Sequence, residues 1–245
     1  MSRWKASGIH LLLSAAIASA VLVFMLTVWY PWPLFEIAGG DRLIFILIGV
    51  DVTLGPIITL IIFKAGKKGL KFDLTVIALA QLAALTYGMH AVFLARPIYI
   101  AFTVDQFELV SAKDIDPQDL AKVTRPEFKR LPLGRPQYIA VAAPKDLQEK
   151  SRLVEAFVTS GKDLFMFPQY YVPYDQRARD ALVRAKPLRI ILARAPEVVK
   201  SYLTSSARSE DSVKFLPLRS PHGDGAVLLD ATTGRPLKIL MVNPW

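Results

Sequence analysis

The sequence predicts a membrane protein with three N-terminal transmembrane α-helices followed by a periplasmic α+β domain. Three observations predict this fold: long apolar segments before residue 95, basic residues in the short loops between them, and strand-like alternation after residue 95. The chain has 245 residues, of which 53% are hydrophobic, more than a soluble domain of this size needs. We therefore divide it into a three-helix transmembrane domain, residues 1–95, and a periplasmic α+β domain, residues 96–245.

Three segments are long enough to cross a membrane, because about 20 consecutive apolar residues span its hydrocarbon core. They lie at about residues 9–30, 43–63 and 73–94. The first segment has an alternative interpretation as a cleaved signal peptide, since residues 18–20 show the small-residue pattern that signal peptidase reads. The apolar run continues beyond that pattern, which favours an uncleaved anchor.

The charges of the short loops predict the orientation. The N-terminus carries Arg3 and Lys5, whereas the loop at residues 31–42 has two acidic residues and a single arginine. By the positive-inside rule, the N-terminus and the lysine-rich second loop face the cytoplasm. Three crossings of a bacterial inner membrane then place the C-terminal domain in the periplasm. The second loop's lysines, which we expect to set the topology and to contact anionic lipid headgroups, are Lys64, Lys67, Lys68 and Lys71.

The composition excludes several classes of site. The absence of cysteine excludes disulfides, thiol catalysis and cysteine-based metal sites. The net charge is +9, without a dense basic block or a nucleic-acid motif, so nucleic acid is not an expected partner. With three histidines and no metal-ligand motif, we expect neither a metal nor a cofactor.

One short stretch resembles catalytic machinery in residue types only. Ser220, His222 and Asp224 are the residue types of an acyl-transfer triad. They lie almost next to one another in the glycine-containing segment SPHGDG, whereas triads are assembled from distant segments. We interpret this stretch as a hairpin turn and predict that the protein is not an enzyme.

The pattern after residue 95 predicts strands and helices around one core. We expect one strand over residues 96–112, another over 137–143, and a closing β-meander over 213–242 with turns at 221–225 and 232–234. Helices are predicted at 116–123, 144–161, 174–185 and 195–207. In the 144–161 helix, the predicted buried face consists of Leu147, Leu153, Val154 and Phe157.

The segment LIGVDVTLGPIITL, residues 47–60, places a carboxylate inside an apolar run. Asp51, Gly55 and Thr59 follow i, i+4, i+8 spacing and therefore share one helix face. Asp51 lies roughly 12 Å from the periplasmic end of its span, at a depth comparable to Tyr87 and His90 in the third span. Such a residue usually faces the bundle interior or a partner, because a charge in lipid costs several kcal/mol.

Three interpretations of this stripe remain open. Asp51 could donate to or accept from Tyr87 or His90 and so fix the packing of the three helices. Alternatively, the stripe faces a foreign transmembrane helix, with Gly55 allowing close approach and Pro56 kinking the helix to open a groove. A proton-relay or transport role is the third interpretation.

The segments SRWKASGIHLLLSAAIA, LIGVDVTLGPIITLIIFKAGKKGLKFDL and FLARPIY resemble the TfpX/TfpZ family of type IV pilin accessory proteins. The resemblance covers about the first 100 residues and implies a non-enzymatic role in the inner membrane, where the protein binds the major pilin and supports its assembly into the pilus. A pilin has one hydrophobic N-terminal helix, with a glutamate near the cytoplasmic end, and a globular periplasmic head. The resemblance transfers no binding residues.

We therefore expect a chaperone-like pilin accessory protein that contacts both the pilin helix and the pilin head, as well as inner-membrane lipids. The alternative is a membrane-anchored periplasmic sensor or ligand-binding protein. The sequence does not specify the oligomeric state.

Overall fold

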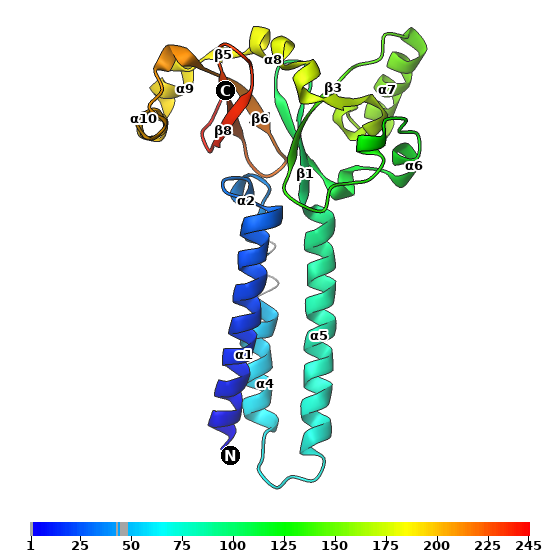
Figure 1. The fold of residues 1–245 in the computed structure, drawn as a ribbon. Coiled ribbons are helices and arrows are strands. Elements are labelled where there is room, and N and C mark those ends of the chain that lie inside the picture. Colours follow the sequence, from blue (N-terminus) through cyan, green and yellow to red (C-terminus); the bar gives the residue numbers. More distant parts are fainter. Residues whose placement is uncertain (1, 43, 45–48) are drawn as a thin grey trace.

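The computed structural model describes residues 2–42, 44 and 49–245, and for Val50 and Asp51 it describes the backbone only. Long helices form an elongated stalk that carries a head built on a β-sheet at one end (Figure 1). The N-terminus lies at the far end of the stalk, and the C-terminus lies in the head (Figure 1).

Three helical segments form the stalk. Helix α1 is capped by the side chain of Ser2 and continues into a π-helix, and the second segment begins as a π-helix that becomes α4. Their bounds are Arg3–Phe24 for α1, Met25–Trp29 for the first π-helix, Gly49–Leu54 for the second π-helix, Gly55–Ile62 for α4 and Leu70–Ala95 for α5.

Two of the described helices are long and apolar enough to cross a membrane, over Arg3–Trp29 and Leu70–Ala95. Only 11% of the most apolar window of each is buried within the chain, so both present apolar surface outward as a lipid-facing helix does. A shorter apolar helix covers Val52–Ile62, and the first part of the predicted 43–63 span lies outside the described residues. Crossing of the membrane by the middle segment therefore stays a prediction.

Pro56 accounts for the change of helix type in the second segment. A proline inside a helix removes one backbone hydrogen bond and crowds the preceding turn. Here the π-helix Gly49–Leu54 ends directly before α4, with Pro56 in the first turn of that α-helix. The wider π-helical turn takes up the disruption, and α4 then continues to Ile62.

The head contains a mixed sheet of eight strands in the order β4-β3-β1-β2-β6-β7-β8, with β5 paired to β6. Strands β1 and β3 are parallel, as are β2 and β6, and the other pairs are antiparallel. The bounds are Pro97–Phe102 for β1, Phe107–Ser111 for β2, Gln137–Val141 for β3, Tyr171–Pro173 for β4, Lys186–Pro187 for β5, Val213–Arg219 for β6, Gly225–Asp230 for β7 and Pro236–Leu240 for β8.

Both faces of this sheet are buried, and alternate residues of each strand enter different cores. Ile100 and Phe102 of β1 join a core on one face, whereas Tyr99 and Ala101 join a core on the other. A third cluster covers β6 to β8 with α9 and α10. This two-sided burial explains why β1 is apolar at every position rather than alternating with polar residues.

The head's helices are short except for two. Helix α7 begins after the Asp146 cap and ends at Gly161, which adopts a left-handed conformation. The α-helices are α2 Leu34–Ile37, α6 Pro117–Leu120, α7 Leu147–Ser160, α8 Ala178–Arg184, α9 Arg189–Arg194 and α10 Pro196–Ser206. Short 3-10 helices lie at Ala112–Asp114, Pro126–Phe128, Leu164–Met166, Pro168–Tyr170, Tyr174–Gln176 and Glu210–Ser212.

Two predictions about the head are wrong. Residues 96–112 form a hairpin rather than one strand, because Thr103 and Gln106 close a turn through a backbone hydrogen bond of 3.0 Å. The predicted buried face of α7 is also wrong: the helix has no buried residue and stands away from the sheet (Figure 1). Its residues Leu147, Val154 and Phe157 are exposed, and Leu153 is half-buried.

Hydrogen bonds fasten the head to the π-helix that continues α1 and to the end of α5. We call residues 129–135 of the head the junction loop. The indole of Trp29 donates to the Leu133 carbonyl at 3.0 Å, and Nε of Arg135 donates to the Thr27 carbonyl at 2.9 Å. The buried guanidinium of Arg96, which follows α5, donates to the Pro132 carbonyl at 3.2 Å.

A second attachment runs through α2, which follows the first long helix. Leu34 and Ile37 of α2 belong to the core of the head, and the Ser220 hydroxyl donates to the Ile37 carbonyl at 2.8 Å. The chain thus enters the head through α2 and α5 at two separate places. These contacts hold the head in a fixed orientation on the stalk.

A buried carboxyl group in the head leads us to predict that the stability of the protein depends on pH. Glu108 of β2 is 8% exposed and borders an acidic hollow that includes Asp163 and Asp224. Burial raises the pKa of Glu108 to about 7, against the hydrogen bond from Gln106 and the charge of Arg219. A carboxyl whose pKa rises on folding destabilises the fold once it ionises. Below about pH 4.5 Glu108 therefore costs no stability, and stability is lost as the pH rises through 7.

Glu108→Gln is therefore expected to raise the melting temperature at pH 8 by about 5 °C and to leave it nearly unchanged at pH 4.5. Glu155→Gln on exposed α7 is the matched control and should change neither value. Thermal unfolding of the full chain in detergent at both pH values measures this, and equal effects of Glu108→Gln at both would contradict it.

Candidate functional site

A polar cluster joins the three stalk helices within their apolar surroundings. Nδ1 of His10 in α1 lies 2.6 Å from the hydroxyl of Thr59 in α4, and Nε2 lies 2.7 Å from Oε1 of Gln81 in α5. Because a carboxamide oxygen only accepts, the Nε2–H of His10 is the donor to Gln81. A neutral His10 then accepts from the Thr59 hydroxyl, so one imidazole bridges both neighbouring helices.

Close backbone approach surrounds this cluster. Gly55 of α4 is buried, and a Cβ atom at this position would lie 2.0 Å from Nε2 of Gln81 and 3.2 Å from Nε2 of His10. The hydroxyl of Ser7 also donates to the Pro56 carbonyl at 2.9 Å. Gly55 therefore supplies the space in which the Gln81 carboxamide reaches His10.

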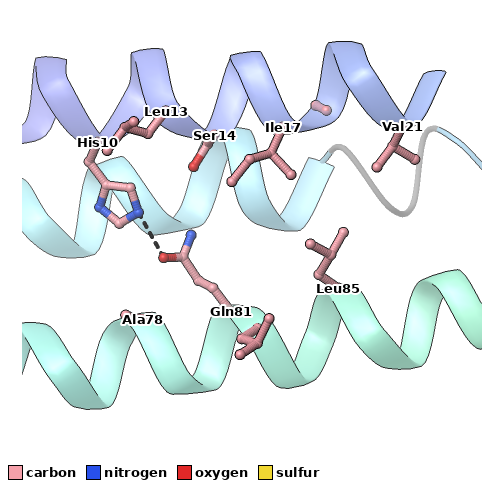
Figure 2. Close-up of a pocket in the computed structure, with 10 residues that line it drawn as sticks. His10, Leu13, Ser14, Ile17, Val21, Ala78, Gln81 and Leu85 are labelled. Carbon is pink, nitrogen blue, oxygen red and sulfur yellow. Dashed lines mark hydrogen bonds between the residues drawn. The ribbon is translucent and has the colours of Figure 1, made fainter. Parts of the chain in front are cut away.

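A groove runs between α1 and α5 beside this cluster (Figure 2). Figure 2 shows side chains of α1 and α5 directed toward each other across it, with the His10–Gln81 hydrogen bond at one end. The hollow measures about 290 Å³. Its lining is almost wholly apolar and consists of His10, Leu13, Ser14, Ile17, Ala18, Val21, Ala78, Gln81, Leu82 and Leu85.

The dimensions of the groove suit the side chains of one helix face rather than a whole helix. A helix with its side chains is about 10 Å across, whereas 290 Å³ holds only a few aliphatic side chains. Small residues at Ser14 and Ala18 widen the α1 wall. The groove can therefore receive apolar side chains from a helix lying alongside, because small residues allow helices to approach closely in membranes.

The structure places two residues of the predicted stripe, Gly55 and Thr59, inside the stalk. Gly55, Pro56 and Thr59 are buried, and Thr59 is only 2% exposed. Thr59 and Gly55 are covered by His10 and Gln81 of the same chain, so these two residues pack within the stalk. The side chain of Asp51 lies outside the described part of the chain, so its role stays a prediction.

The other predicted residues lie on outer surfaces. Tyr87 is 78% exposed and His90 is exposed, so these two side chains face outward from α5. In the loop before α5, the Lys67 ammonium pairs with Asp73 at 2.6 Å. All four lysines of this segment are exposed: Lys64, Lys67, Lys68 and Lys71. Their role in setting the topology stays a prediction.

Comparisons with known proteins identify the family. The family model for fimbrial assembly protein FimB matches residues 1–39. The chain is 34% identical over 234 residues to the fimbrial assembly protein of serogroup E1 from Dichelobacter nodosus, and 33% identical to that of serogroup I. Each alignment covers 92% of this chain and 90% of the relative. This chain belongs to the fimbrial assembly protein family.

A third relative from Dichelobacter nodosus, the fimbrial assembly protein of serogroups C1 and C2, is 39% identical over 113 residues, which cover 45% of this chain and 86% of the relative. No solved structure is detectably similar to the chain. The narrower TfpX/TfpZ designation stays a prediction. The segment that matches the FimB model includes α1 with His10 and continues through α2.

His10, the central residue of the polar cluster, was not identified from the sequence. His10 lies seven residues after Arg3, roughly 10 Å along the helix, inside an apolar run where a histidine is unusual. That signal was available, as was Gln81 in the middle of the third span. The sequence does not reveal that His10 and Gln81 pair, because their pairing depends on how the helices pack.

Ser220, His222 and Asp224, in the turn between β6 and β7, are not assembled as a triad. The Ser220 hydroxyl donates to the Ile37 carbonyl, and the Asp224 carboxylate accepts from the indole of Trp245 at 2.8 Å. His222 packs its ring against Gly39. Within the part of the chain that the structure describes, no group of three or more His, Asp or Glu residues is placed to hold a metal ion.

The Gly55 contact gives a double-mutant test. Gly55→Ala is expected to displace the Gln81 carboxamide from His10 and to cost about 1 kcal/mol of stability, the worth of an interhelical hydrogen bond. Unfolding of the detergent-solubilised chain measures this. Gly8→Ala is the matched control, since nothing lies within 4 Å of its added Cβ.

In the Gln81→Ala background, Gly55→Ala should cost much less, because the side chain it collides with is gone. Equal costs in both backgrounds would show that Gly55 is needed for another reason.

Proposed function

We propose that this protein is an inner-membrane accessory protein, chaperone-like in action, that binds the type IV major pilin and supports its assembly into the pilus. The names of the relatives support a role in fimbrial assembly. The single structural observation that carries the pilin-binding part is the apolar groove between α1 and α5. A pilin presents one apolar helix, whose side chains are what this groove can receive.

The position of the polar cluster supports the same partner. His10 and Gln81 stand on the groove wall toward the end that carries the N-terminus, which we propose is cytoplasmic. The family resemblance implies a pilin glutamate near the cytoplasmic end of its helix. Polar side chains on the groove wall lower the cost of placing a partner's carboxyl group in lipid, where an acid in apolar surroundings is costly. The sequence, in contrast, predicts Asp51 in the periplasmic half of its span.

The proposed topology has three crossings, with the N-terminus in the cytoplasm and the head in the periplasm. The two long apolar helices and the exposed lysines between α4 and α5 support it. A pilin bound in the groove would then carry its own head on the same side of the membrane as this one. We propose a binding role rather than an enzymatic one, because Ser220 and Asp224 have other partners.

Topology is testable with single cysteines, since the natural chain has none. Val183, which is 82% exposed on α8, replaced by cysteine should react with a membrane-impermeant maleimide in intact spheroplasts. Lys68→Cys in the lysine-rich loop should react only after lysis. The reverse pattern would place the head in the cytoplasm and remove the proposed site of action.

Pilin binding is testable with a photo-crosslinking amino acid at Leu13 or at Leu12. Both side chains are exposed, at 61% and 72%, but only Leu13 lines the groove. We expect a crosslink to pilin from position 13 and little or none from position 12. Equal crosslinking from both positions, or none, would contradict groove binding.

A substitution that fills the groove tests the same proposal through piliation. Ala18→Phe, in the groove lining, should reduce surface pili while the level of this protein is unchanged. Ala16→Phe, on an exposed part of α1 outside the lining, is the matched control. The rival function, a periplasmic sensor or ligand-binding protein, predicts instead that both substitutions leave piliation unchanged.

A further inference from the structure

The junction loop has a second surface besides the one that holds the stalk. Three hydrogen bonds fix its backbone and Arg135 to the ends of the long helices: Trp29 to Leu133, Arg96 to Pro132, and Arg135 to Thr27. The loop therefore lies beside the last turns of α1 and α5, where each apolar helix ends. Leu131 of the loop packs against the core of the head, whereas Lys129, Arg130, Leu133 and Arg135 are exposed.

The outward side of the loop combines an apolar residue with cations. Leu133 is 68% exposed, although the neighbouring Phe128 is buried in the head. Lys129, Arg130 and Arg135 are also exposed. In the described ranges no carboxylate forms an ion pair with any of these three cations, whereas other basic residues such as Lys67 and Arg208 do have such partners.

We propose that the junction loop binds anionic phospholipid headgroups at the membrane surface. Leu133 inserts at the boundary of the acyl chains, and Lys129, Arg130 and the outer nitrogens of Arg135 bind the phosphodiester oxygens. This inference rests on the membrane placement proposed above. It does not depend on pilin being the partner.

The position of the loop favours lipid over an acidic protein surface. Hydrogen bonds to Thr27 and Trp29 hold the loop at the end of an apolar helix, which is the level of the headgroups for a spanning segment. Trp32, 65% exposed three residues after Trp29, is a residue type enriched at that level. An exposed leucine among unpaired cations matches the acyl boundary and the phosphate layer together, whereas an acidic protein face would satisfy only the cations.

Lipid contact at this loop also bears on the orientation of the head. Two of the residues proposed at the headgroups, Leu133 and Arg135, also make hydrogen bonds to Trp29 and Thr27 at the end of the first stalk helix. A head bound to lipid at the junction loop and to the stalk through α2 cannot tilt without breaking one of these contacts.

The experiment uses the full chain with an environment-sensitive fluorophore (NBD) on single cysteines at positions 133, 61 and 183. The chain is reconstituted in phosphatidylcholine nanodiscs with and without phosphatidylglycerol. Ile61, which is 75% exposed on α4, reports the lipid placement of the stalk, and Val183 reports water around the head. We expect emission at short wavelength from 61 and 133 and at long wavelength from 183.

The charge part is tested with Lys129→Gln/Arg130→Gln, read as phosphatidylglycerol retained over phosphatidylcholine in native mass spectrometry. The preference should fall roughly fivefold for each removed charge. The matched control is Lys145→Gln/Lys150→Gln, which removes two exposed charges in and beside α7, away from the stalk, and should change nothing.

The outcomes separate this inference from the proposed function. A probe at 133 in water while the probe at 61 is in lipid overturns the inference and leaves the membrane placement intact, whereas both in water overturns the placement itself. Protection of 133 only after pilin is added overturns the inference in favour of a protein contact. An unchanged lipid preference in Lys129→Gln/Arg130→Gln overturns the headgroup contact.

Discussion

The arrangement of the stalk depends on the two hydrogen bonds of His10. Apolar helices in lipid gain little from the hydrophobic effect when they associate, because lipid tails are as apolar as leucine. Specific contacts must therefore decide which faces meet. His10 bridges Thr59 and Gln81 from a single ring, and the absence of a side chain on Gly55 leaves room for the carboxamide. One residue thus fixes three helices at one level and leaves the faces above it apart.

The second fixed level is the junction, where the head is fastened to both long helices. Trp29 and Arg135 attach the junction loop to the end of α1, while Arg96 attaches it to the end of α5. The hydrogen bonds of His10 and those of the junction loop, at two levels along the stalk, hold α1 and α5 at a set spacing. The groove between α1 and α5 exists because α4 and the polar cluster fill only part of that space.

The sequence was sufficient where a pattern has one physical outcome. A long apolar run specifies a long helix, and the glycine-containing turns at 221–225 and 232–234 specify the closing meander, which the structure confirms. It was insufficient where packing decides. The turn at 103–106 has no glycine to mark it, and the apolar stripe of α7 identifies a face without identifying what covers it. Equally, His10 and Gln81 are 71 residues apart, so only the packed helices reveal their pairing.

The His10 hydrogen bonds and the junction with the head would constrain how a proposed partner helix reaches the groove. The groove lies between two helices with exposed apolar side chains, so a helix bound there would enter sideways from the lipid and leave the same way. Lateral exchange suits a protein that holds a subunit temporarily, since no backbone of this chain needs to unfold for release. The apolar lining gives such a partner little more than lipid gives it, so the polar end at His10 would supply the discrimination. Selectivity for a partner helix would then reside at the polar end of the groove.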